Sequence, residues 1–160
     1  MGALKIDEIF KRIKGAKLPL TIGPDIKDTK KRAAWELNQE AANLIRLDKY
    51  IEAEPKVRAA LALDPDLKYA HYNLGTILGM QEKDPESINE FKEAHKLDPQ
   101  WVDPVACIAS TLYYSGKKEE SKPYWVMAQG LATTKEELEA FKMVFAEMEG
   151  ETGKTVTPPR

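Results

Sequence analysis

The chain has 160 residues, of which 42% are hydrophobic and 31% are charged, with a net charge of −2. This balance suits one folded domain and excludes disorder over most of the length, and no apolar run approaches the roughly 20 residues of a membrane span. One cysteine, Cys107, and two histidines exclude an intramolecular disulfide and a zinc module, so we expect no metal or other cofactor.

The charge is distributed unevenly along the chain. Residues 1–33 hold nine lysines and arginines against four acidic residues, a net +5, and the remaining residues therefore carry −7. The pattern indicates a basic N-terminal arm on an acidic body. Nucleic-acid binding requires a basic face, so we expect no nucleic-acid partner.

Residues 1–14 predict a short basic amphipathic helix, because Ile6, Ile9, Phe10 and Ile13 recur at helical spacing among lysines and arginines. They lack the features of a secretory signal, which favours a cytoplasmic location. The favoured role is a cap on the helices that follow; the alternatives are self-association, docking on a partner, or contact with an anionic membrane surface. Residues 15–33 predict an extended connector, whose apolar run at 18–22 can lie against the body or in a groove on it.

From residue 34 onward the sequence repeats with a period of 34. Leu63-Asp64-Pro65, for example, recurs as Leu97-Asp98-Pro99. Seven columns keep this register without a gap, which divides the chain into units at 34–67, 68–101 and 102–135. The columns are Leu37, His71 and Val105; Ala41, Gly75 and Ala109; Leu44, Leu78 and Leu112; Ala53, Ser87 and Ser121; Val57, Phe91 and Trp125; Ala60, Ala94 and Ala128; and Leu63, Leu97 and Leu131.

Each unit predicts two amphipathic helices, because its columns fall at helical spacing on two faces. The columns that contain Ala41 and Ala60 hold small residues, which suits two helix backbones in close contact. Helix breakers separate the two members of each pair, as at Ser115-Gly116. Asp84-Pro85 and Asp103-Pro104 are typical of an N-cap followed by proline at the first helical position.

After the last unit, Thr133 with Glu136 or Thr134 with Glu137 offers a capping box. An apolar face follows, formed by Leu138, Phe141, Val144, Phe145 and Met148. Residues 136–149 therefore predict a helix that covers the otherwise exposed end of the last unit. Residues 150–160 have little to bury and predict a flexible tail.

These units resemble the tetratricopeptide repeat (TPR) family. The closest match to the family pattern is the run Ala70-His71-Tyr72-Asn73-Leu74-Gly75 with Phe91, Ala94 and Leu97-Asp98-Pro99. The resemblance implies an all-α fold: a right-handed α-solenoid of three helix pairs, with an N-terminal helix and a C-terminal capping helix.

The resemblance also implies a concave groove, lined by the first helix of each pair, that binds a segment of a partner protein. The site residues are then Trp35, Asn38, Tyr69, Tyr72, Asn73, Thr76, Met80, Ser110, Tyr113 and Tyr114, with Ala42, Ile45, Asp103 and Ala106 beside them. Aromatic side chains of this kind supply binding hot spots. Asn73 stands where the family often uses an asparagine to bind a peptide backbone. The alternative is that Trp35 and some of the tyrosines cover neighbouring repeats or the N-terminal segment.

Two TPR subgroups can be compared with this sequence, one by its binding residues and one by its size and layout. Co-chaperones that bind the acidic C-terminus of heat-shock proteins use two lysines, an arginine and two asparagines, and of the matching residues only Asn73 agrees; the others are Asn38, Ala42, Asp103 and Cys107. Without cations a terminal carboxylate is poorly neutralised, so the sequence excludes that clamp. The small TPR chaperones of type III secretion are similar in size and layout, and they remain an alternative.

No short catalytic motif is present, and the carboxylates fall at helical surface positions, so we expect no enzymatic activity. Cys107 and His71 fall within helices, where packing is the favoured role. The sequence thus predicts a cytoplasmic protein-interaction adaptor. The alternatives are a chaperone for a hydrophobic client, and a scaffold recruited to a membrane surface by the N-terminal helix.

Overall fold

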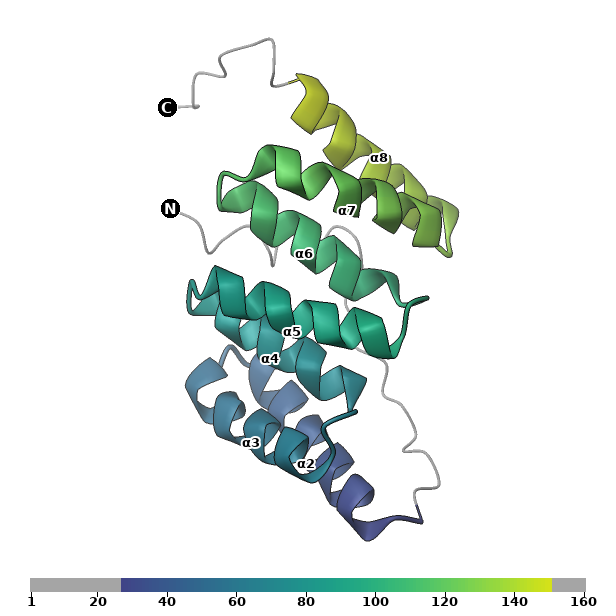
Figure 1. Cartoon of the computed structure of the whole chain (residues 1–160). Helices are drawn as coiled ribbons and strands as arrows, with labels where there is room; N and C mark the ends of the chain where they lie inside the picture. The colour runs from purple at the N-terminus through teal and green to yellow at the C-terminus, as the bar shows by residue number, and fades with distance from the viewer. Residues whose placement is uncertain (1–26, 151–160) are drawn as a thin grey trace.

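A computed structural model describes residues 27–150, and its regular structure in that range is entirely helical (Figure 1). The helices are α2 (Thr29–Arg46), α3 (Tyr50–Leu63), α4 (Lys68–Met80), α5 (Asp84–Leu97), α6 (Val102–Tyr114), α7 (Lys118–Leu131) and α8 (Lys135–Gly150). Helices α2–α3, α4–α5 and α6–α7 form three hairpins that stack in chain order, and α8 packs on α7. This confirms the predicted all-α solenoid; the predicted N-terminal helix and nearly all of the predicted tail lie outside the described residues.

Helix α2 begins five residues before the predicted first unit. The Asp28 carboxylate caps it by accepting hydrogen bonds from the backbone N–H groups of Lys30, at 2.8 Å, and Lys31, at 3.3 Å. Residues 29–33, predicted as part of an extended connector, are therefore helical. The reason is a local cap that lies outside the repeated columns.

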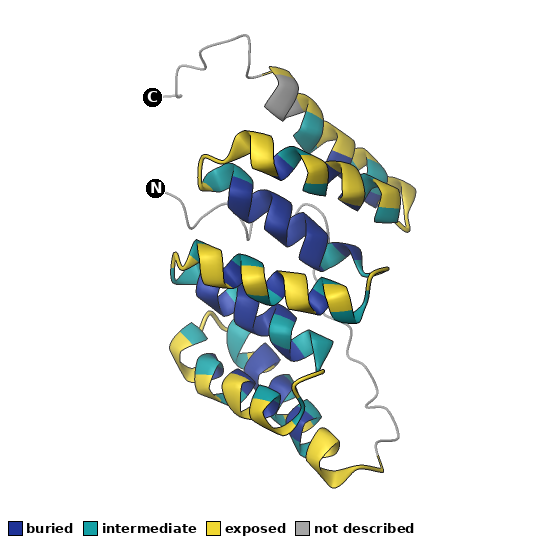
Figure 2. Cartoon of the chain, in the orientation of Figure 1, coloured by how far each residue is buried: buried dark blue, intermediate teal, exposed yellow. Residues whose placement is uncertain are grey.

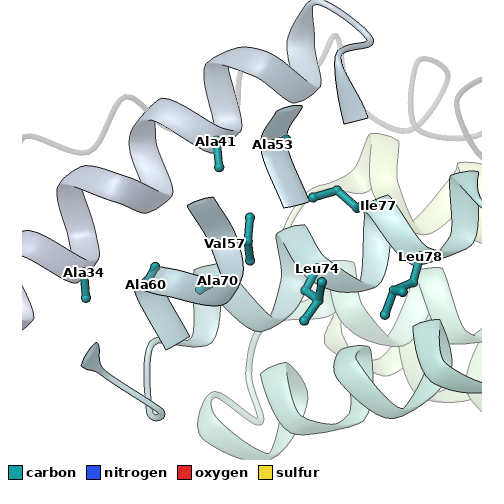
Figure 3. Close-up of a cluster of buried hydrophobic side chains, with 9 residues drawn as sticks. All are labelled: Ala34, Ala41, Ala53, Val57, Ala60, Ala70, Leu74, Ile77 and Leu78. Carbon is teal, nitrogen blue, oxygen red and sulfur yellow. The ribbon is translucent and has the colours of Figure 1, made fainter. Parts of the chain in front are cut away.

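Each hairpin is held together by a small residue on its first helix and a large one on its second. Gly75 illustrates the fit, since a Cβ atom at this position would stand 2.8 Å from the Phe91 ring. Val57, Phe91 and Trp125 are buried in the three successive hairpins. Figure 3 shows the first of these interiors, where Ala41 faces Val57 and the side chains of α4 close the cluster from the second repeat.

The same turn closes all three hairpins. The N–H groups of Lys49, Lys83 and Lys117 bond to the carbonyls of Leu44, Leu78 and Leu112 at 2.9–3.0 Å, which is the Schellman pattern. The residue before each lysine has a positive φ: 58° at Asp48, 61° at Glu82 and 81° at Gly116. Only the third hairpin has glycine there, so the first two turns hold a side chain in a strained backbone conformation.

The connections between repeats also recur. Asp64 and Asp98 each accept a bond from the backbone N–H two residues ahead, at 3.3 Å to Asp66 and 3.2 Å to Gln100. The third hairpin lacks this aspartate and ends differently. There Thr134 Oγ1 accepts from the Glu137 N–H at 3.1 Å, and Glu137 Oε2 accepts from the Thr134 N–H at 3.3 Å. Of the two predicted capping boxes, this is the one that forms.

The starts of α5 and α6 differ by a residue or more from the predicted caps. Lys83 precedes α5 and Trp101 precedes α6, so Asp84 and Asp103 lie inside the first turns. Both carboxylates are engaged elsewhere: Asp84 accepts from the Ser115 hydroxyl, and Asp103 accepts from Trp101 Nε1 at 2.7 Å. The two aspartates tie neighbouring segments together and do not cap their own helices.

The positive φ at the three hairpin turns predicts that a glycine-to-alanine substitution destabilises the protein at a turn but stabilises it inside a helix. Gly116→Ala has open space around its new Cβ, so its cost is backbone strain alone and lowers the free energy of unfolding by about 1 kcal/mol. Glu82→Gly relieves the equivalent strain and raises it by up to about 1 kcal/mol. Gly130→Ala, in α7 with equally open surroundings, is the control and stabilises by about 0.5 kcal/mol. Urea unfolding of the three variants measures this, and equal effects of the two alanine substitutions would contradict it.

Candidate peptide-binding face

The predicted site residues lie on α2, α4 and α6, which form one layer of the stack, with α3, α5 and α7 in the other (Figure 1). We call these the inner and outer layers, and we call the surface formed by the predicted site positions the inner face. In the second and third hairpins the inner helix is buried along much more of its length than the outer one (Figure 2). In α6 every residue from Pro104 to Leu112 is buried, whereas in α5 only Ser87, Phe91 and Ala94 are.

An aromatic cluster forms where α4 and α6 begin. The ring centroids of Tyr69 and Tyr72 lie 5.3 and 4.8 Å from that of Trp101, and Tyr72 also lies 5.7 Å from Phe91. Tyr69 and Trp101 are half-buried, while Tyr72 is buried. The cluster therefore offers an apolar edge that is partly open and firmly supported from beneath.

Trp101 was missed among the predicted site residues. It belongs to the connection between α5 and α6, so no helical column includes it. Its only signal in the sequence is a large aromatic residue two positions before Asp103, whose carboxylate accepts from its indole N–H. That hydrogen bond fixes the ring against the two tyrosines.

Lys68 extends this edge with a positive charge. Its Nζ lies 5.0 Å from the Tyr69 ring centroid and 2.5 Å from the Asp98 carboxylate. The Lys68 ammonium holds the pKa of Asp98 below its ordinary value. The ion pair joins α4 to the turn after α5, so the edge of the aromatic cluster is bound to the stack on both sides.

Two asparagines meet in the middle of the inner face. Asn73 Nδ2 donates to Asn38 Oδ1 at 2.8 Å, and both side chains are buried. A carboxamide offers two donors and an acceptor, so one mutual hydrogen bond leaves the pair further capacity for a peptide backbone. The structure thus brings together two predicted site residues from neighbouring repeats.

The other predicted residues are spread along the three helices. The Thr76 hydroxyl donates to the Tyr72 carbonyl at 3.0 Å, and the Ser110 hydroxyl donates to the Ala106 carbonyl at 2.8 Å. Tyr113 and Tyr114 form an edge-to-face pair with centroids 5.1 Å apart. Trp35 and Met80 are half-buried on α2 and at the end of α4.

Cys107 is fully buried in the cluster of Tyr72, Phe91, Ala94 and neighbouring residues, where packing was the expected role. Burial raises the pKa of the Tyr72 hydroxyl well above its ordinary value, and its hydrogen bond with Cys107 acts in the same direction. At this point the inner face is neutral and apolar. Asp103 adds a negative charge nearby, so the surroundings disfavour an anionic ligand.

No protein-family model matches the chain, and no curated protein matches it in sequence. Solved structures do match in fold. SycD, a type III secretion translocator chaperone of Yersinia enterocolitica, superposes with a TM-score of 0.68 at 18% identity, over 82% of this chain and all of SycD. The second TPR of Spaghetti (RPAP3), bound to the HSP90 peptide SRMEEVD, gives 0.60 at 19% identity, over 64% and 94%.

A mutant of MamA gives a TM-score of 0.59 at 20% identity, over 80% of this chain and 83% of MamA. The chain has the tetratricopeptide-repeat fold. The resemblance read from the sequence is therefore confirmed at the level of the fold. Within residues 27–150, no helix of this TPR stack is long and apolar enough to cross a membrane, and no group of three or more potential metal ligands occurs.

His71 occupies a TPR column that otherwise holds Leu37 and Val105, and it has a structural role. Its Nδ1 lies 2.7 Å from a Glu90 carboxylate oxygen and its Nε2 lies 2.8 Å from the Pro65 carbonyl oxygen. Both partners are acceptors, so both ring nitrogens donate when the imidazole is protonated. Glu90, with the Pro65 carbonyl and Glu93, raises the pKa of His71 above its ordinary value against the opposing effect of burial.

This arrangement predicts a pH dependence of stability. The folded chain binds the His71 proton more tightly than the unfolded chain does. The contribution is thus fully present below the unfolded pKa of about 6.5 and is lost as the pH rises through the folded pKa. The free energy of unfolding should fall between pH 6 and 8 in the native chain and change less in His71→Gln. An unchanged slope in His71→Gln would contradict the assignment.

Proposed function

We propose that the chain is a non-enzymatic adaptor that binds an extended segment of a partner protein on the inner face of its TPR stack. The observation that carries the proposal is the meeting of two features on one surface: the Tyr69–Tyr72–Trp101 cluster and the Asn38–Asn73 pair. Apolar side chains of the partner bury against the aromatic rings, and the carboxamides bond to its backbone. The fold comparison with a peptide-bound TPR supports the same kind of partner.

The chemistry of the inner face defines the class of segment. Asp103 is the carboxylate among the predicted positions, and tyrosines, asparagines, serine and threonine make up most of the rest. A face of this kind suits a largely uncharged, apolar segment, because Asp103 is its one charged position and most buried ligand charges would lack an opposite partner.

A second candidate is a chaperone that keeps a hydrophobic client soluble. The observation that favours it is the match to SycD, because the chain covers that chaperone from end to end. The same inner face would hold the client. Copurification with an aggregation-prone hydrophobic protein supports this candidate, and a partner that stays soluble alone favours the adaptor.

The inner face can be tested once the partner is identified by crosslinking mass spectrometry with the full chain as bait. Tyr69→Ala removes half-buried aromatic surface. It should lower the affinity for the partner at least tenfold, which corresponds to about 1.4 kcal/mol. Tyr69 suits the test better than Tyr72, because truncating the buried Tyr72 would cost about 3 kcal/mol of stability.

The matched control is Met143→Ala, which removes an exposed apolar side chain from α8, outside the inner face. Titration calorimetry of both variants against the identified partner measures the difference. Equal affinities of Tyr69→Ala and Met143→Ala would remove the inner face from the proposal.

The proposed binding face differs in charge from a face that binds the acidic HSP90 peptide. The positions that would supply the three clamp cations hold Asn38, Asp103 and the buried Cys107. We expect the HSP90 peptide SRMEEVD to bind at least about 100-fold more weakly than it binds the second TPR of Spaghetti, measured in parallel by fluorescence anisotropy. Comparable affinity for the two proteins would contradict the assigned ligand class.

A further inference from the structure

The inner side of α6 is deeply buried. Val102, Val105 and Ala109 pack toward α7 and α8, with Trp125 and Phe141, and Ile108 and Leu112 pack with Phe91. These residues account for two sides of the helix. Helices α5 and α7 pack closely against α6, and Tyr72 of α4 packs with its Cys107.

Ser110 belongs to the third side, the inner face, and it is 1% exposed. Ala106, one turn before it on the same side, packs in the cluster of Trp125 and Phe141. Asp103 and Tyr114, on the same side, are half-buried. This side of α6 is therefore neutral and closely packed around Ser110, with the Asp103 carboxylate at its edge.

We infer that the inner face is the docking surface for this chain's own residues 16–24, which act as a built-in ligand. The inference rests on the proposed function, since it uses the same face as the partner. A partner segment must then displace residues 16–24 before it binds.

The position and length of the chain before Lys27 favour this occupant. Helices α2, α4 and α6 all start at the same edge of the stack, so the chain that enters α2 comes from the edge where Tyr69 and Trp101 lie (Figure 1). The step from α2 to α6 is two helix spacings, about 20 Å. An extended chain covers that in roughly seven residues, and 26 residues precede Lys27.

The chemistry of the segment matches the face. Residues 18–22 are Leu-Pro-Leu-Thr-Ile, an uncharged apolar run, and Pro19 and Pro24 favour an extended backbone. Lys17 flanks the run and offers a charge complementary to Asp103. Residues 1–14 fit less well, because their helical pattern and four basic residues do not suit a neutral face.

A labelled peptide tests the inference. The probe is a fluorescein-labelled peptide of residues 15–26, and the host is the full chain with Leu18→Asp, Leu20→Asp and Ile22→Asp, which vacates the face. The peptide should bind this variant at least tenfold more tightly than it binds the native chain, where the tethered copy competes at a millimolar effective concentration. Adding Tyr69→Ala to this variant should lower its affinity for the peptide at least tenfold.

The matched control carries the same three changes in the C-terminal tail: Thr155→Asp, Val156→Asp and Thr157→Asp. It should bind the peptide as weakly as the native chain does, and circular dichroism should give all variants the same helicity. A second readout uses Cys107, the only cysteine, which lies beside Tyr72. Its alkylation by a maleimide should be at least about threefold faster in the segment variant than in the tail variant.

The outcomes separate the inference from the proposed function. Failure of the peptide to bind the segment variant, or equal binding to the native chain, overturns the inference. Binding that persists after Tyr69→Ala also overturns it, since the peptide then lies elsewhere. If partner crosslinks still map to the inner face in those cases, the proposed function stands without the built-in ligand.

Discussion

The contact between a small residue on the first helix of each hairpin and a large one on the second determines the rest of the structure. At Gly75 the Phe91 ring occupies the place of a side chain, and the buried Ser87 hydroxyl donates to the Gly75 carbonyl at 2.7 Å. The second helix of each hairpin covers only one face of the first helix, so another side of the first helix stays uncovered by it. That uncovered side becomes the inner face, so the surface proposed to bind a partner is a consequence of how the hairpins close.

Repetition of this contact every 34 residues produces a stack, but the repeats are not equivalent on the inner face. The buried column changes from Val57 to Phe91 to Trp125, and the turns change from strained Asp48 and Glu82 to relaxed Gly116. The aromatic cluster arises between the second and third repeats, where Trp101 enters from a connection. The stack therefore has a centre that differs chemically from its ends.

The sequence predicted what depends on periodicity, namely the three hairpins, their small and large columns, and the helix after Thr134 with its capping box. The sequence-based prediction failed where a side chain outside the repeated columns makes the deciding hydrogen bond. Asp28 extended α2, and the Asp84 and Asp103 carboxylates bonded to Ser115 and Trp101 in place of their own helix starts. Trp101 was missed for the same reason. Contacts between elements are fixed by three-dimensional packing, which local spacing does not encode.

The inner-face residues fall into two groups by burial. Tyr72 packs with Cys107 and holds α4 against α6, and the buried Asn73 bonds to Asn38 of α2, so changes there lower stability as well as any affinity for a partner. Tyr69, Thr76 and Tyr114 are half-buried, and their outer atoms are not needed by the core. Substitutions at these half-buried residues can therefore change the specificity for a partner with little loss of stability. The buried group supplies a rigid base, which lowers the entropy that must be lost when an extended segment binds.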